Sequence, residues 1–256
     1  MSKKRIMPCL ATLILSTATV LAEPTRVVVR VRSHDAKFIG SSAGGVAVTI
    51  YDDTSGAVLA SGVIRGGTGD TRTLMKEPVA RGQQIAGEKA ASFTATVDID
   101  RPTRVRIEVR GPLAGGLNCH TASRTLVLLP GHDIVGDGVV FELYGCIVHV
   151  VSPCANQVFK PGETVPIEAY VVMLCGCPVE PGGLWNADDF TVVATITDAK
   201  GKRLGQVPLR YSGTRSRFAG EFKPPGTGGY QVLVTVEQKG TNNAGFALSG
   251  FAVKGG

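Results

Sequence analysis

Apolar residues along this chain come in short runs that are rich in Val, Ile and Thr and that end at Gly, Pro, Asp or Asn. Short runs of β-branched residues bounded by turn-forming residues are typical of strands rather than helices. A helical period is found only around residues 74–85, where Pro78 and Gly82 limit its length. The pattern therefore predicts strands at residues 26–32, 46–51, 57–64, 93–99, 103–110, 125–129, 139–143, 164–173, 190–197, 203–211, 217–222, 230–237 and 246–253.

Strands separated by turn signals every 8 to 12 residues or so are typical of antiparallel sandwiches. The number of predicted strands fills two sandwiches better than one, so the predicted fold is all-β with two antiparallel β-sandwich domains. We place them at residues 23–150 and 151–256, with the boundary just before Ser152-Pro153. Residues 65–92 form the longest predicted loop, and long ordered loops on sandwiches often carry binding sites. The alternative is a disordered insert.

The first 22 residues have the pattern of an export signal. Lys3, Lys4 and Arg5 supply a positive start, a short apolar stretch follows, and residues 20–22 (Val-Leu-Ala) match a small-residue cleavage site. The apolar stretch is too short to serve as a membrane anchor. We therefore expect a periplasmic or secreted protein.

Charge argues against a nucleic-acid ligand. The whole chain has 27 Lys and Arg against 21 Asp and Glu, and removal of the predicted leader takes away three of the basic residues. Nucleic-acid binding usually needs a concentrated basic face. The partners we expect are proteins of the cell envelope.

Five cysteines follow the predicted leader, and an exported protein usually forms disulfides from its cysteines. The odd number leaves one thiol over, and spacing does not define the pairing. The simplest expectation joins Cys154 to Cys175 or Cys177, and Cys119 to Cys146.

Several motifs of the second half match a known type of domain. Residues 151–153 (Val-Ser-Pro) precede Phe-Lys-Pro-Gly-Glu-Thr-Val at 159–165, and the end of the chain carries Phe-Ala-Gly-Glu-Phe at 218–222 and Gly-Gly-Tyr-Gln-Val at 228–232. Residues 150–254 resemble bacterial immunoglobulin-like domains through these motifs. The resemblance implies a fold and no particular chemistry.

The first half has a weaker motif, Gly-Val-Ala-Val-Thr-Ile-Tyr-Asp at residues 45–52 followed by Gly56 and another strand. Through it, residues 25–145 resemble transthyretin-like or carboxypeptidase-regulatory-like sandwiches.

One segment suggests metal chemistry. On a strand, Met173, Cys175 and Cys177 would present three sulfurs on one face, and sulfur ligands suit Cu(I). His149 and Cys154 lie near the predicted domain junction and would complete such a site. The competing expectation is that these cysteines are in disulfides and that no cofactor is bound.

Other combinations point to chemistry less specifically. Asn118-Cys119-His120 puts a thiol beside an imidazole, but neighbours on a strand point to opposite faces. Ser33-His34-Asp35 contains the residue types of a catalytic triad within a predicted turn, although such triads are assembled from separated segments. No phosphate-binding or hydrolase signature occurs, so we assign no catalytic residues.

Two loop clusters have the oxygen ligands that calcium prefers, Asn186 with Asp188 and Asp189, and Asp133 with Asp137. Neither has the spacing of a known calcium loop. Turns rich in Asp and Asn explain both clusters without an ion.

Two surface features are candidates for partner contact. Arg104, Arg106 and Arg110 share one strand face, and they would form a larger basic surface with Arg30 and Arg32 if the two strands were neighbours. The alternative is an ordinary solvated sheet face. Trp185 lies in a predicted loop, where it would be a contact residue if exposed and would plug the sandwich if buried.

The sequence predicts an exported, non-catalytic binding or accessory protein that acts through protein–protein contacts. Two alternatives remain: a periplasmic copper-handling protein that uses the Met-x-Cys-x-Cys segment, and a secreted hydrolase with an unassigned site.

Overall fold

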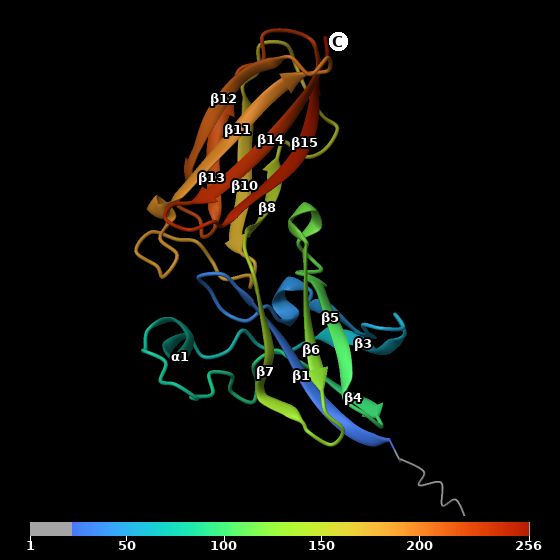
Figure 1. Cartoon of the computed structure of the whole chain (residues 1–256). Coiled ribbons are helices and arrows are strands. Elements are labelled where there is room, and N and C mark those ends of the chain that lie inside the picture. Colours follow the sequence, from blue (N-terminus) through green and yellow to red (C-terminus); the bar gives the residue numbers. More distant parts are fainter. Residues whose placement is uncertain (1–21, 256) are drawn as a thin grey trace, which may run out of the picture.

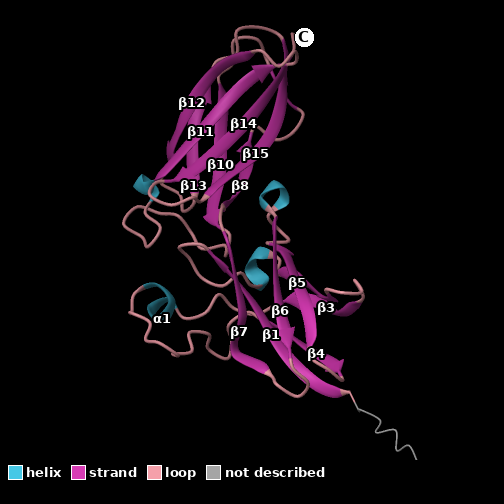
Figure 2. Cartoon of the chain, in the orientation of Figure 1, coloured by secondary structure: helices cyan, strands magenta, loops and turns pink. Residues whose placement is uncertain are grey.

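The computed structural model describes residues 22–255. The predicted export signal lies outside them except for its last residue. Strands dominate, and the helices are single short turns (Figure 2). The prediction of an all-β fold is confirmed.

The first half of the chain forms two sheets that face each other (Figure 1). The strand orders are β4-β1-β7 and β3-β2-β5-β6, and β1 pairs parallel with β7 while the other pairs are antiparallel. The strands are β1 (Glu23–Ser33), β2 (Val46–Asp52), β3 (Val58–Ile64), β4 (Phe93–Ile99), β5 (Thr103–Gly111), β6 (His120–Leu128) and β7 (Ile134–Leu143).

Alternation along these strands builds the first core. Val27, Val29 and Val31 of β1 are fully buried, and Val105 and Ile107 of β5 meet them from the opposite sheet. Apolar residues at every second position face inward, as expected for packed sheets.

The second half forms one continuous set of strands in the order β8-β10-β13-β12-β11-β14-β15-β9. The β12–β13 link involves only two residue pairs, Arg210 with Ala219 and Tyr211 with Phe218, so this set folds over into two layers. The strands are β8 (Cys146–Ser152), β9 (Gln157–Phe159), β10 (Val165–Met173), β11 (Phe190–Asp198), β12 (Arg203–Tyr211), β13 (Arg217–Phe222), β14 (Gly228–Gln238) and β15 (Ala244–Val253).

This pairing is that of an immunoglobulin-like sandwich, in which a β8-β10-β13 layer packs against β12-β11-β14-β15. The Tyr230 hydroxyl, near the start of β14, donates a hydrogen bond of 2.6 Å to the Gly226 carbonyl. Such a tyrosine corner is a hallmark of the fold. The short β9, which the sequence did not predict, pairs parallel with the end of β15.

The predicted helix at residues 74–85 is shorter and earlier than expected. Helix α1 spans Thr71–Met75, and the Asp70 carboxylate caps it by accepting from the Thr73 amide at 2.9 Å. The chain then runs without regular structure to β4, as the loop prediction for residues 65–92 stated. Three 3-10 helices complete the described elements: η1 (Ser41–Ala43), η2 (Gly116–Asn118) and η3 (Ala187–Asp189).

At the junction, each half contributes buried residues to the core of the other. Val171 and Met173 of β10 pack in the second core, whereas the alternate residues Val172 and Leu174 pack in the first. In return, Ala36 from the turn after β1 is fully buried in the second core. The predicted boundary at residues 150–151 falls inside β8, and a division that keeps every sheet whole lies between β7 and β8.

Candidate functional site

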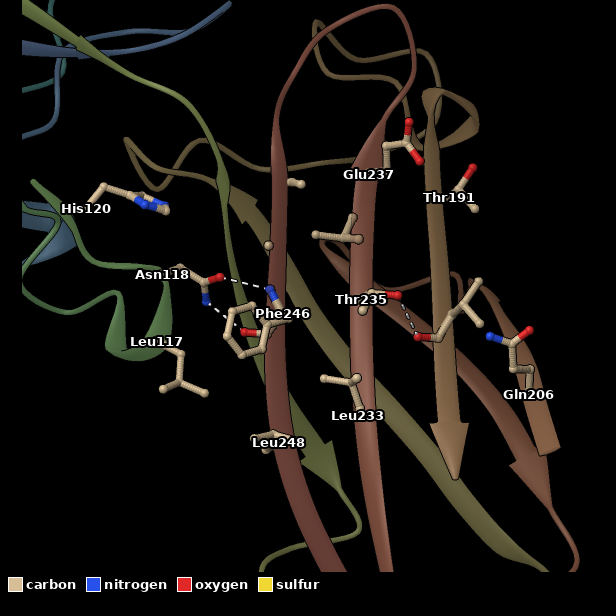
Figure 3. Close-up of a pocket in the computed structure, with 14 residues that line it drawn as sticks. Leu117, Asn118, His120, Thr191, Gln206, Leu233, Thr235, Glu237, Phe246 and Leu248 are labelled. Atoms are coloured by element: carbon tan, nitrogen blue, oxygen red, sulfur yellow. Dashed lines mark hydrogen bonds between the residues drawn. The ribbon is translucent and has the colours of Figure 1, made fainter. Parts of the chain in front are cut away.

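An open groove lies on the outer face of the β12-β11-β14-β15 sheet, beside the junction (Figure 3). Its volume is about 910 Å³. Its apolar lining comes from three strands of the second half and one short helix of the first half. These apolar residues include Leu117, Val193, Leu233, Phe246 and Leu248.

Strand alternation explains why apolar side chains point into the groove. Ala247 of β15 faces the core, so its neighbours Phe246 and Leu248 face outward and are 40% and 57% exposed. In β14, Leu233 points outward between buried Val232 and Val234. The outer face of an antiparallel sheet normally carries polar residues. This face is therefore an exposed apolar patch, and such patches mark interaction sites.

The wall of the groove comes from η2, which the first half places against β15. The side chain of Asn118 is 2% exposed. Its amide oxygen accepts from the Phe246 N–H at 2.9 Å, and its amide nitrogen donates to the Phe246 carbonyl at 3.1 Å. Asn118 thus occupies the edge of β15 as a neighbouring strand would, and such cover protects an edge from unwanted pairing.

A glycine permits this approach. A side chain at Gly245 would press on the Cys146 carbonyl and would come within 3.0 Å of the Asn118 amide oxygen. Next to Asn118, Leu117 is 56% exposed and extends over the side of the groove.

Polar groups also line the groove, and one of them, Thr235, lies between Phe246 and Val193. Gln206 donates to the Thr195 hydroxyl at 3.2 Å, and the Thr235 hydroxyl donates to the Val193 carbonyl at 3.4 Å. Glu237 is exposed and makes no ion pair with any described residue. The groove thus combines apolar side chains with polar ones, as protein-binding surfaces do.

Trp185 belongs to the junction and not to the exposed surface. It is 6% exposed, and its indole nitrogen donates to the Asp35 carbonyl at 2.9 Å. Of the two sequence interpretations, the structure supports the buried plug, so the assignment of Trp185 as a partner contact is wrong. Its burial joins the loop after β10 to the turn after β1.

The same turn is held by Asn243, which is fully buried. Its amide nitrogen donates to the His34 carbonyl at 3.1 Å and to the Gln238 side-chain oxygen at 2.9 Å, and its oxygen accepts from the Gly145 N–H at 2.8 Å. Gln238 in turn donates to the Asp35 carboxylate at 2.9 Å. Hydrogen bonds to buried groups fix geometry because leaving any of them unpaired is costly.

The cysteines pair differently from the expectation. Cys175 and Cys177 are joined to each other, and Cys119, Cys146 and Cys154 are free. Cys154 follows the end of β8, which runs antiparallel to β10 with Cys146 opposite Met173. Cys154 therefore lies at the opposite end of the strand pair from Cys175 and Cys177, and the predicted bridge between them does not form.

Met173, Cys175 and Cys177 do not lie on one straight strand, so the expected row of three sulfurs on one strand face does not form. The chain reverses after Met173, where the Gly176 N–H bonds to the Met173 carbonyl at 2.7 Å and Gly176 has a φ of 77°. Met173, Cys175 and Cys177 are buried in the second core, whereas His149 is exposed and stacks on Tyr170. Among residues 22–255, no group of three His, Cys, Asp or Glu side chains is placed to hold a metal ion.

The two candidates for nucleophilic chemistry are structural. Asn118 pairs with β15, and no hydrogen bond joins Cys119 to His120 within the described part of the chain. Ser33-His34-Asp35 ends β1 and forms the turn that enters the junction, and Ser33 is fully buried.

The candidate calcium ligands also have partners. Asp133 receives the Arg26 backbone N–H at 2.7 Å and an ion pair from its guanidinium, and these bonds lower the pKa of the Asp133 carboxyl. Asp137 accepts from the Ala86 N–H at 2.7 Å, and Asn186 caps η3.

The arginines do not form one surface, because β1 and β5 belong to different sheets. Arg104 pairs with Asp53 at 2.8 Å, and Arg106 pairs with Glu108 at 3.1 Å. Arg110 is exposed and has no carboxylate partner among the described residues. Arg30 is 7% exposed and donates to the carbonyls of the loop before β4. Burial lowers the pKa of the Arg30 guanidinium.

No protein-family model matches the chain, and no curated protein sequence does. Among solved structures, the fibronectin(III)-like modules of CbhA from Clostridium thermocellum align at 12% identity with a TM-score of 0.31, covering 91% of this chain and 94% of theirs. The titin Z1Z2 domains solved in complex with telethonin align at 12% identity and a TM-score of 0.27, covering 92% of this chain and 98% of theirs. An engineered protein gives 16% identity and a TM-score of 0.32, but the match covers 46% of this chain and 22% of the other.

At such TM-scores these likenesses do not define a shared arrangement. The immunoglobulin-like class of the second half rests on its own strand pairing and its tyrosine corner. Across residues 22–255, no helix combines the length and the apolar character required to cross a bilayer.

The apolar residues of the groove were not among the candidates drawn from the sequence, and Asn118 and His120 were candidates only as part of the motif around Cys119. A signal was present, because Phe246, Ala247 and Leu248 place apolar side chains on both faces of one strand. A strand with one solvated face would alternate. The contribution of Leu117 and Asn118 has no sequence signal, since it depends on how the two halves pack.

Proposed function

We propose that this chain is an exported, non-catalytic binding module of the cell envelope and that it binds another protein in the groove on its immunoglobulin-like sheet. The observation that carries the proposal is the open apolar face formed by Phe246, Leu248 and Leu117 in an otherwise packed sandwich. The pattern of the first 22 residues supports export.

The arrangement of the groove supports binding rather than catalysis. The titratable side chains of the groove are the Glu237 carboxylate on β14 and the His120 imidazole on β6, and the groove is an open face rather than a closed pocket. Catalysis needs positioned groups within hydrogen-bond reach of one another, and no hydrogen bond joins these two among the described residues.

We further propose that the chain has two domains, divided between β7 and β8, and that they act as one body. Hydrogen bonds from Asn118, Trp185 and Asn243 cross the junction and support this view. The strand orders of the first half are compatible with the transthyretin-like resemblance of residues 25–145.

A selection of random peptides tests the binding function. Heptapeptides displayed on phage are selected on the mature chain and then measured on the Leu248→Gln variant. Fully burying a leucine gains about 2 kcal/mol, so burying the 57% of Leu248 that is exposed contributes roughly 1 kcal/mol. We therefore expect about fivefold weaker binding by Leu248→Gln.

Val127 on β6 offers a matched control, because it is 58% exposed and lies outside the groove. The Val127→Gln variant should bind the same peptides as the unaltered chain does. Selection of no peptides, or of peptides that both variants bind equally well, would contradict the proposed function.

A further inference from the structure

We propose that the segment bound in the groove combines apolar side chains with one Lys or Arg, which pairs with Glu237. This inference rests on the proposed function and names the chemistry of its partner. It follows from the charges around the groove and from the register of β14 and β15.

The charge of the groove is one-sided. Glu237 is the only carboxylate among the 14 residues that line it, and no Lys or Arg lines it. Glu237 is exposed and has no ion-pair partner in the described chain. Among the lining residues, a ligand cation placed there meets no Lys or Arg, whereas a ligand carboxylate meets repulsion from Glu237.

The same charges argue against a second copy of this chain as the occupant. In a dimer that buries the two grooves against each other, each groove would contribute a carboxylate and no Lys or Arg. Like charges in an interface oppose association. A different protein that carries a cation is the better match.

Register sets the distance between the apolar and the basic contacts. Leu248 lies opposite Leu233, and Ala244 lies opposite Glu237. Leu233 and Glu237 are on the same face of β14 and four residues apart, which is about 14 Å along a strand. For an extended segment lying along β14, an apolar residue and a basic residue about four positions apart would match both contacts.

The test uses the same random heptapeptides on three proteins: the unaltered mature chain, Glu237→Lys, and Glu221→Lys. Glu221 is an exposed carboxylate on β13, in the opposite sheet, and serves as the charge-matched control. Peptides selected by the unaltered chain should be rich in Lys or Arg next to apolar residues. Selection on Glu237→Lys should favour Asp or Glu instead, and selection on Glu221→Lys should leave the basic preference unchanged.

Affinity of a selected synthetic peptide gives the magnitude. Exposed ion pairs contribute up to about 1 kcal/mol, so Glu237→Gln should weaken binding by about two- to fivefold. The effect should shrink at high salt because the pair is near the surface.

The outcomes separate the two proposals. Peptides that need Leu248 but show no basic preference, or that bind Glu237→Lys as tightly as the unaltered chain, would overturn this inference and leave the proposed function standing. A dimer in sedimentation analysis that Leu248→Gln dissolves would identify a second copy as the occupant and would also overturn it. Absence of any peptide that depends on Leu248 would overturn the proposed function itself.

Discussion

Replacing Asn243 by alanine removes three side-chain hydrogen bonds from the junction between the two halves. The partners left behind are the Gly145 N–H, the His34 carbonyl and the Gln238 side-chain oxygen. The backbone bonds of residue 243, including the 2.9 Å bond from the Gln238 N–H to its carbonyl, are unaffected.

The magnitude follows from the burial of these groups. Asn243 is fully buried and Gln238 is 6% exposed, so water does not readily replace the lost amide. A typical hydrogen bond contributes about 1 kcal/mol, and a buried partner left unpaired costs about 1 to 3 kcal/mol. We expect Asn243→Ala to lower the free energy of unfolding by roughly 3 kcal/mol, a large part of the stability of an ordinary domain.

Guanidinium chloride unfolding monitored by fluorescence measures this loss. Trp185 is the one tryptophan of the chain, and it bonds to Asp35 beside the His34 carbonyl, so its emission reports on the junction. Asn242→Ala is the matched control, because Asn242 is the exposed neighbour of Asn243. The reasoning fails if the two variants differ in unfolding free energy by less than about 0.5 kcal/mol, the usual range of surface substitutions.

Three further predictions concern the thiols and the tyrosine corner. Burial raises the pKa of the Cys146 thiol from 9.0 to about 12, so the folded state holds a proton that the unfolded state loses between those values. The free energy of unfolding should therefore fall by up to about 1.4 kcal/mol per pH unit as pH rises from 9 toward 12. Urea unfolding of Cys146→Ala should lack this part of the pH dependence. An equal slope of unfolding free energy against pH in both proteins would count against the prediction. Iodoacetamide on the folded, unreduced protein should label exposed Cys154 rapidly and Cys146 only after unfolding, and peptide mass mapping should find Cys175 linked to Cys177; a Cys154 disulfide would refute the pairing. Tyr230→Phe should cost about 1 kcal/mol of unfolding free energy through its lost bond to Gly226, and thermal melting that does not change would contradict this role.

Much of the fold follows from local pattern. Strands β4, β12 and β13 begin and end close to where the pattern predicts, because glycine or proline residues near their ends mark clear boundaries. The first part of β7 was missed because Gly136 and Gly138 look like turn residues. There the strand pairs irregularly with β1, and both glycines have φ near 70°.

The site was harder to predict because its residues depend on long-range packing. Met173 and Cys177 look like strand neighbours, yet a glycine turn places them across from each other. Arg30 looks like a surface cation, but the loop before β4 covers it. Asn118 contacts the edge of β15 because of how the first half packs against the second, and no pattern within residues 116–120 indicates that contact.

Cross-linking in cells that export the protein tests most directly whether the groove is the docking face. A photoreactive benzoylphenylalanine replaces either Leu248 in the groove or Val127 on β6, which are 57% and 58% exposed. The account predicts a covalent adduct with another protein from position 248 and none from position 127 after irradiation. Adducts of equal yield from both positions, or an adduct from position 127 alone, would contradict it.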